Sequence, residues 1–143
     1  MASYIPDAAR QRVTEAFSNR CSYCLAAQRY VLSRLEIEHI IPVALGGNSD
    51  EGNLCLARRL CNLYKSDQIE ATDPITNATV ALFNPRTQAW SDHFKWSQDG
   101  AIVVGLTPVG RATVEALRLN NEIAAEVRRN WVLVGWHPPS GVK

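Results

Sequence analysis

A short stretch of alternating apolar and charged residues constrains the fold of this chain most strongly. Residues 32–38 read Leu-Ser-Arg-Leu-Glu-Ile-Glu, so that the last two apolar residues share one face and the two acidic residues share the other. A period of two predicts a half-buried β-strand. Ile40-Ile41-Pro42 and the turn-forming run Gly46-Gly47-Asn48-Ser49-Asp50 follow, and they predict a loop directly after this strand.

A helical pattern comes after the loop. Leu56, Leu60 and Leu63 recur at helical spacing and predict a helix from Leu54 to Ile69. The opposite side of this helix carries polar residues that lie three or four positions apart: Arg58, Asn62, Lys65 and Ser66.

The remaining elements indicate an α+β chain. Thr107-Pro108 supplies a cap and a first-turn proline for a later helix, which is interrupted near Asn120-Asn121 and turns Leu117, Ile123, Val127 and Trp131 toward the core. We expect the tail after Trp136 to fray. The other predicted elements are a helix over 7–19, a Cys21–Cys24 knuckle, a strand over 79–83 and a hairpin of 94–96 with 101–104.

Length and composition limit the classes of protein. The chain has 143 residues, which suits a single domain, and its formal net charge of +1 gives no global basic field. The cations comprise 12 arginines and three lysines. No apolar run is long enough to cross a bilayer, and no charged start precedes an apolar stretch. We therefore expect a cytoplasmic protein without a membrane association.

Three short motifs occur in a particular order. Glu38-His39 is followed by Ile40-Ile41-Pro42, then by Asn53-Leu54, and then by Asn62-Leu63-Tyr64-Lys65. This order and spacing resembles the HNH endonuclease family over about residues 21–67. The resemblance implies a ββα-metal core, to which this chain adds an N-terminal helix and a C-terminal hairpin and helices over about 70–136. We expect residues 1–143 to form one HNH nuclease domain.

The resemblance also implies a role for each motif residue. His39 would be the general base that takes a proton from the attacking water, and Asn53 would brace the loop that orients it. Glu38 and Asn62 would bind one divalent cation, Mg²⁺ or Mn²⁺. Glu38 and His39 are neighbours in a strand, so they converge only if the backbone bends there. Lys65 and Arg58 lie on the Asn62 face, where they could bind flanking phosphates.

The four cysteines leave the question of a structural zinc open. Cys21 and Cys24 form a complete Cys-x-x-Cys knuckle, but the second knuckle has Cys61 with Arg58 where the family has a cysteine. Cys55 lies three residues too early to replace the missing thiolate without a rearranged loop. Structural zinc takes four ligands, and we therefore favour the absence of a fully ligated zinc. The alternatives are closure by Cys55 and a loose three-cysteine site.

The predicted function is metal-dependent hydrolysis of the phosphodiester bonds of DNA, with double-stranded DNA as the expected partner. The alternative is a catalytically silent HNH fold that binds DNA or a protein. A zinc-ribbon interaction module is a third hypothesis, which the missing thiolate disfavours. The sequence does not indicate which protein, if any, this chain binds.

Overall fold

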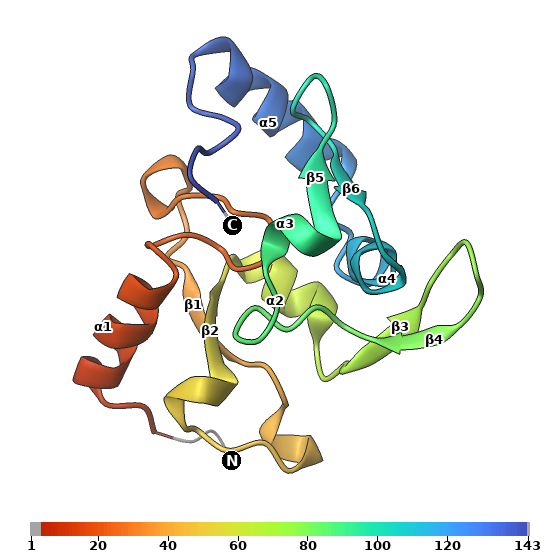
Figure 1. Cartoon of the computed structure of the whole chain (residues 1–143). Coiled ribbons are helices and arrows are strands. Elements are labelled where there is room, and N and C mark those ends of the chain that lie inside the picture. Colours follow the sequence, from red (N-terminus) through yellow and green to blue (C-terminus); the bar gives the residue numbers. More distant parts are fainter. Residues whose placement is uncertain (1–3, 143) are drawn as a thin grey trace. The chain divides into compact units, whose positions relative to one another are not determined.

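The computed structural model describes residues 4–142, and its elements are labelled in Figure 1. The chain has an α+β fold with small antiparallel sheets, as predicted. It divides into two compact units. The first holds the described residues through Ile69 together with Asn84–Thr87, and the second holds Glu70–Phe83 and the residues from Gln88 onward. No helix in the described part of the chain has the length and apolar character needed to span a membrane.

The first unit consists of a helix, two strands and a second helix, connected by short 3-10 turns. Strands β1 (Glu36–His39) and β2 (Leu54–Ala57) pair antiparallel, with Glu38 opposite Cys55 and His39 opposite Leu54. Helix α1 (Asp7–Ala16) precedes them and α2 (Arg59–Lys65) follows β2. The 3-10 turns cover Gln28–Tyr30, Val43–Leu45 and Glu51–Asn53.

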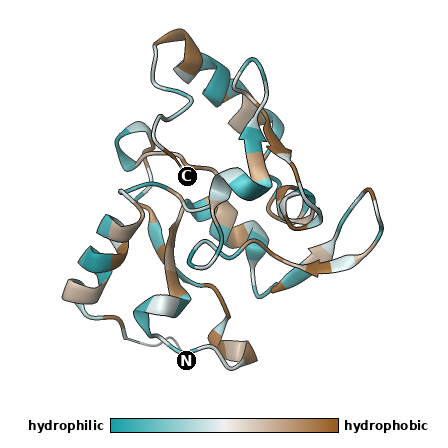
Figure 2. Cartoon of the chain, in the orientation of Figure 1, coloured by the Kyte–Doolittle hydropathy of each residue, from teal (hydrophilic) through white to brown (hydrophobic). Residues whose placement is uncertain are grey.

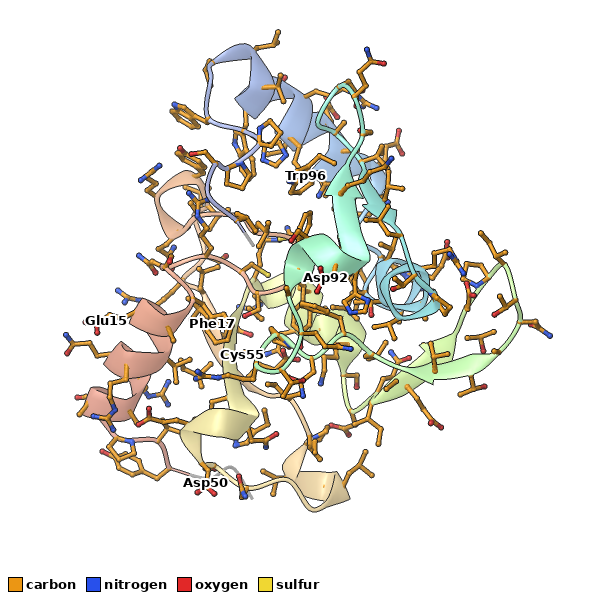
Figure 3. The ribbon with its side chains drawn as sticks, viewed as in Figure 1. Glu15, Phe17, Asp50, Cys55, Asp92 and Trp96 are labelled. Carbon is orange, nitrogen blue, oxygen red and sulfur yellow. The ribbon has the colours of Figure 1, made fainter. Side chains whose placement is uncertain are left out.

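The apolar side of α1 packs on β2. Val13 of α1 and Leu54 of β2 are fully buried and form a core cluster with Ile5, to which Phe17 adds a partly buried ring. Figure 3 shows Glu15 on the outer side of the same helix. Removal of this apolar surface from water stabilises the unit. The cluster fixes α1 beside the sheet, so residues of α1 can contribute to a site on β1.

The helix predicted over 54–69 is confirmed only for Arg59–Lys65, because residues 66–69 are not helical and the first four residues form a strand. Residues 54–57 form β2, and all four are buried. Figure 2 shows this strand as a hydrophobic segment. A continuous apolar run fits a strand that is covered on both faces as well as it fits a helix. As a result, Leu60 and Leu63 of α2 lie 38% and 65% exposed and do not form the predicted core face.

The second unit contains two hairpins and three helices. Its pairs are β3 (Glu70–Thr72) with β4 (Thr79–Ala81) and β5 (Phe94–Trp96) with β6 (Val103–Gly105). Its helices are α3 (Trp90–His93), α4 (Pro108–Ala116) and α5 (Glu122–Leu133). Thr107 accepts a hydrogen bond from the Gly110 amide, which confirms the predicted cap.

Two expectations for the second unit are wrong. The tail after Trp136 does not fray at its start, because His137 is buried and bonds through Nε2 to the Gly100 carbonyl, 2.9 Å away. Ile123 and Val127 do not turn toward the core but are 72% and 36% exposed. Leu117 is buried as predicted. That all 143 residues form one domain stays a prediction.

Candidate active site

A hollow of about 400 Å³ lies along β1 in the first unit. Within residues 4–142, β1 pairs only with β2, so its other edge is free. Side chains from both faces of a strand can reach such an edge. The hollow is therefore lined by Ile37 and His39 of one face as well as by Glu38 and Asn62 of the other. Arg10 of α1 also lines it.

His39 is half-buried at the end of β1. Its Nε2 atom lies 2.9 Å from Ser49 Oγ in the loop after the strand. Partial burial lowers the pKa of His39, and the charge of nearby Lys65 lowers it further. Both effects favour the neutral imidazole, which is the form that can accept a proton.

Glu38 precedes His39 in β1, so its side chain points to the opposite face of the strand, and it is buried. Oε1 lies 3.4 Å from Lys65 Nζ, and the Cys55 thiol donates to Oε2 at 3.4 Å. Burial raises the pKa of Glu38, and the charge of Lys65 opposes this rise. The backbone bend that we expected between Glu38 and His39 is absent, because β1 pairs regularly with β2 through both residues.

Asn62 lies at the middle of α2 and faces β1. Its Nδ2 atom donates to Glu36 Oε1 at 2.9 Å. Glu36 and Glu38 are two positions apart in β1, so they share the strand face that α2 covers. Asn62 therefore contacts a carboxylate of the predicted strand, but the carboxylate is that of Glu36, and Asn62 lines the hollow beside it.

Asn53 braces the loop after β1 through three hydrogen bonds. Its Oδ1 accepts from the Ile41 amide at 2.9 Å, while its Nδ2 donates to the carbonyl oxygens of Ile41 and Asn48 at 3.0 and 2.7 Å. Gly47 allows the loop backbone to approach Ile41 closely, because a Cβ atom at this position would clash with the Ile41 carbonyl oxygen. Ser49, the partner of His39, belongs to the same braced loop.

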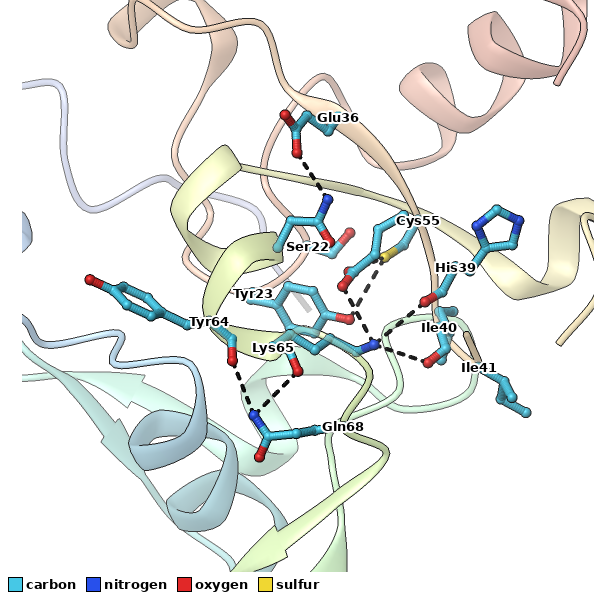
Figure 4. A network of polar contacts seen from close by, with 12 residues as sticks. Ser22, Tyr23, Glu36, His39, Ile40, Ile41, Cys55, Tyr64, Lys65 and Gln68 are labelled. Atoms are coloured by element: carbon cyan, nitrogen blue, oxygen red, sulfur yellow. Dashed lines mark hydrogen bonds and ion pairs between the residues drawn. The ribbon is translucent and has the colours of Figure 1, made fainter. Parts of the chain in front are cut away.

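The structure does not support phosphate binding by Lys65 or by Arg58. Lys65 is 2% exposed, and its ammonium donates to the carbonyl oxygens of His39 and Ile40 at 3.4 and 3.1 Å (Figure 4). Arg58 directs Nη2 toward Cys61 Sγ, 4.0 Å away. The expected helix face breaks down because Arg58 precedes α2 as its cap residue and Lys65 ends it.

The order of these elements is that of the motifs: an acidic residue and a histidine in β1, an asparagine before β2 and an asparagine in α2. Residues 21–68 match the HNH endonuclease family. A search of curated proteins and a search of solved structures found no match. The match confirms the predicted resemblance, and we refer to residues 21–68 as the HNH segment.

Three cysteines of the HNH segment form a compact cluster. The sulfur atoms of Cys21, Cys24 and Cys61 lie within 4.8 Å of one another, and all three residues are buried, so the cluster could hold a metal ion. Hydrogen bonds from the other two thiols lower the pKa of Cys24 well below its ordinary value. Burial raises the pKa of Cys21 to about 12.

Cys55 does not join this cluster. Its thiol is buried, 3.8 Å from Tyr23 Oη and 3.4 Å from Glu38 Oε2; Figures 3 and 4 label Cys55. Arg58 lies against the cluster instead, with its guanidinium near Cys61. A guanidinium donates hydrogen bonds and cannot ligate a metal. The donor set thus provides three of the four ligands that structural zinc takes.

Sequence reasoning missed Ser49, which contacts His39, and Arg10, which lines the hollow. Ser49 belongs to a run that signalled only a turn, because the partner of a loop hydroxyl depends on how the loop folds back. Arg10 lies 29 positions from His39, and only the packing of α1 on the sheet brings it to the same hollow. The apolar spacing of α1, with Ala9, Val13 and Phe17 on one side, was the available signal for that packing.

Proposed function

We propose that the HNH segment hydrolyses phosphodiester bonds of DNA, with His39 as the general base and one divalent cation as cofactor. The observation that carries this proposal is the common hollow of His39, Glu38 and Asn62 within a segment that matches the HNH family. The family match supports nuclease activity in general, and the hollow suggests which residues perform it.

His39 would accept a proton from the attacking water. The arrangement with Ser49 suits this task, because Ser49 Oγ can accept a hydrogen bond from Nε2–H and thereby favour the tautomer whose Nδ1 lone pair is available. Asn53 would act as a positioning residue. It holds the loop backbone at Ile41 and Asn48, and through that loop it fixes Ser49 and the imidazole.

The residues of the hollow suit a hard cation. Mg²⁺ and Mn²⁺ prefer oxygen ligands, and Glu38 and Asn62 offer a carboxylate and an amide oxygen. Glu38 Oε1 is buried without a hydrogen-bond partner among the described residues and lies 3.4 Å from Lys65 Nζ, so a bound cation would share this oxygen with the ammonium. When bound, the cation would stabilise the negative charge that develops on the phosphate and the leaving oxygen.

One observation favours the alternative of a catalytically silent HNH fold. Lys65 already lies against Glu38 Oε1 and balances its charge. A permanent ion pair of this kind would neutralise the Glu38 carboxylate, as a bound cation would, but it would not stabilise the charge that develops on a phosphate during cleavage. The segment would then bind DNA or a protein partner without cleaving it.

A plasmid-nicking assay separates the two functions. We expect wild-type protein to nick or cut supercoiled DNA in Mg²⁺ or Mn²⁺ and to lose this activity in EDTA. His39→Ala should reduce cleavage at least about 100-fold, the scale of general base catalysis, while the folded state and DNA affinity are retained. Cleavage by His39→Ala at the wild-type rate would remove His39 as the base, and DNA binding without cleavage in any metal would establish the silent fold.

A further inference from the structure

A second hollow adjoins the candidate active site along β1. It has a volume of about 540 Å³, and we call it the arginine groove because Arg10, Arg34 and Arg59 line it. It shares Arg10, Ile37 and Asn62 with the first hollow. A ligand that fills the arginine groove would therefore continue directly into the hollow that contains His39.

Two of the three groove arginines, Arg34 and Arg59, differ from the other arginines of the first unit, whereas Arg10 donates to the Ile5 carbonyl at 3.1 Å. Elsewhere, Arg12 pairs with Glu51 at 2.6 Å, and Arg86 donates to the Leu54 carbonyl at 2.9 Å. Arg34 and Arg59 are exposed and have neither a hydrogen-bond nor an ion-pair partner among residues 4–142. Their guanidinium groups keep all their donors for a ligand.

The groove has a positive balance of charge. Glu36 is the acidic residue that lines it, against three arginines, and its Oε1 already accepts a hydrogen bond from Asn62. A planar guanidinium matches the geometry of a phosphate group and binds it through two parallel hydrogen bonds. The chain as a whole has a net charge of only +1, so this local cluster is the feature that can attract a polyanion.

We propose that the arginine groove binds the sugar-phosphate backbone of the DNA strand that enters the active site. This inference rests on the proposed function, because it assigns the phosphates next to the scissile one to Arg34 and Arg59. These arginines replace Lys65 and Arg58, which the fold commits to interior contacts. Because contacts to phosphates read no bases, this groove adds affinity and register but no sequence preference.

The test measures DNA affinity separately from cleavage. Fluorescence anisotropy with a labelled duplex in EDTA would give the Kd of wild-type protein, Arg34→Ala, Arg59→Ala and the double variant over a series of salt concentrations. Arg12→Ala is the matched control, because it removes the same charge from an exposed arginine that pairs with Glu51. Single-stranded DNA provides a second probe.

We expect the double variant to bind the duplex at least about tenfold more weakly in low salt. Its plot of log affinity against log salt should be less steep by roughly 1 to 2, because each lost phosphate contact removes about 0.9 from the slope on duplex DNA. Arg12→Ala should leave both quantities close to those of wild type. A double variant that behaves like Arg12→Ala would overturn the proposal.

The two proposals fail in different ways. Loss of affinity in the double variant, together with no cleavage by wild type, would support the groove and reject the nuclease function. Cleavage by wild type with an unchanged salt slope in the double variant would reject the groove alone. Absence of any DNA binding by the wild-type protein would reject both.

Discussion

Lys65 Nζ lies 3.4 Å from Glu38 Oε1, and the two side chains are only 2% and 4% exposed. The same ammonium donates to the carbonyl oxygens of His39 and Ile40. A single buried cation thus connects the end of α2 to the Glu38 carboxylate and to the end of β1 from which His39 projects. We infer that Lys65 supports the architecture of the site from inside.

The first prediction concerns this ion pair. Lys65→Met leaves the Glu38 carboxylate buried without its partner, and loss of one member of a buried pair costs about 3–5 kcal/mol. We expect a decrease of that size in the free energy of unfolding, measured by urea denaturation. Glu38→Gln combined with Lys65→Met should be more stable than Lys65→Met alone, because no unpaired charge remains.

Lys95→Met is the control for this experiment, since Lys95 is exposed on β5. Its stability should stay within about 0.5 kcal/mol of wild type, as for most surface substitutions. If Lys65→Met were as stable as Lys95→Met, the buried contacts of Lys65 would have no energetic importance.

The second prediction concerns the loop that carries Ser49. A Cβ atom at Gly47 would lie 1.8 Å from the Ile41 carbonyl oxygen, so Gly47→Ala must push the loop backbone away and disturb the hydrogen bonds of Asn53. We expect a loss of stability of about 1–3 kcal/mol, the usual cost of overpacking, and a loss of DNA cleavage. Thermal denaturation and the nicking assay measure the two effects.

Gly52→Ala is the matched control, because no heavy atom lies within 4 Å of a Cβ at that position. It should behave like wild type in both assays. Equal effects of the two substitutions would mean that the tight approach of Gly47 to Ile41 does not position the loop.

Much of the first unit could be predicted from local patterns. The alternation before His39 identified β1, and the turn-forming run identified the loop, because both signals depend on neighbouring residues. The short motifs were sufficient to predict the family. Strand β2 was missed because Leu54-Cys55-Leu56-Ala57 lacks alternation: both of its faces are covered, so burial no longer reports a period.

The side-chain contacts of the site could not be predicted in the same way. The sequence indicated that Glu38 and Lys65 are polar, and polarity predicts exposure, whereas the fold buries the two together. Arg58 contacts Cys61 only three positions later, but the sulfur atoms beside Cys61 belong to Cys21 and Cys24. The contribution of Arg10 depends on how α1 packs on β2. The proximity of these separate segments is set by tertiary packing.

The third prediction concerns the pH dependence of cleavage. Burial and the charge of Lys65 both lower the pKa of His39, so the imidazole stays neutral to a lower pH than usual. Because the neutral form is the base, we expect the acidic limb of kcat against pH to have its midpoint below the ordinary histidine value of about 6.5. An NMR titration of the His39 imidazole should give a higher pKa in Lys65→Met than in wild-type protein, since this variant removes the nearby positive charge and keeps Glu38.

Ser49→Ala tests whether Ser49 positions His39. We expect a lower kcat with little change in KM, because the hydroxyl contacts the imidazole and lies outside the arginine groove. For the pH dependence of kcat, a midpoint of the acidic limb at or above about 6.5 in wild-type protein would contradict the lowered pKa of His39. An unchanged kcat in Ser49→Ala would show that the contact has no part in catalysis.

The fourth prediction concerns the cysteine cluster. Arg58 lies where the family has a cysteine, and its guanidinium is directed at Cys61 beside the sulfurs of Cys21 and Cys24. Arg58→Cys should therefore complete a four-thiolate set and create a structural zinc site. We expect the purified variant to retain one zinc per chain through gel filtration, and we expect its thermal stability to fall when EDTA is added.

Arg59→Cys is the control, because Arg59 is exposed and follows Arg58 directly. Wild-type protein and the control should retain less than one zinc per chain. Tight binding of one zinc by the wild type would show that three cysteines are sufficient, and an Arg58→Cys variant without zinc would show that this position does not face the cluster closely enough to ligate.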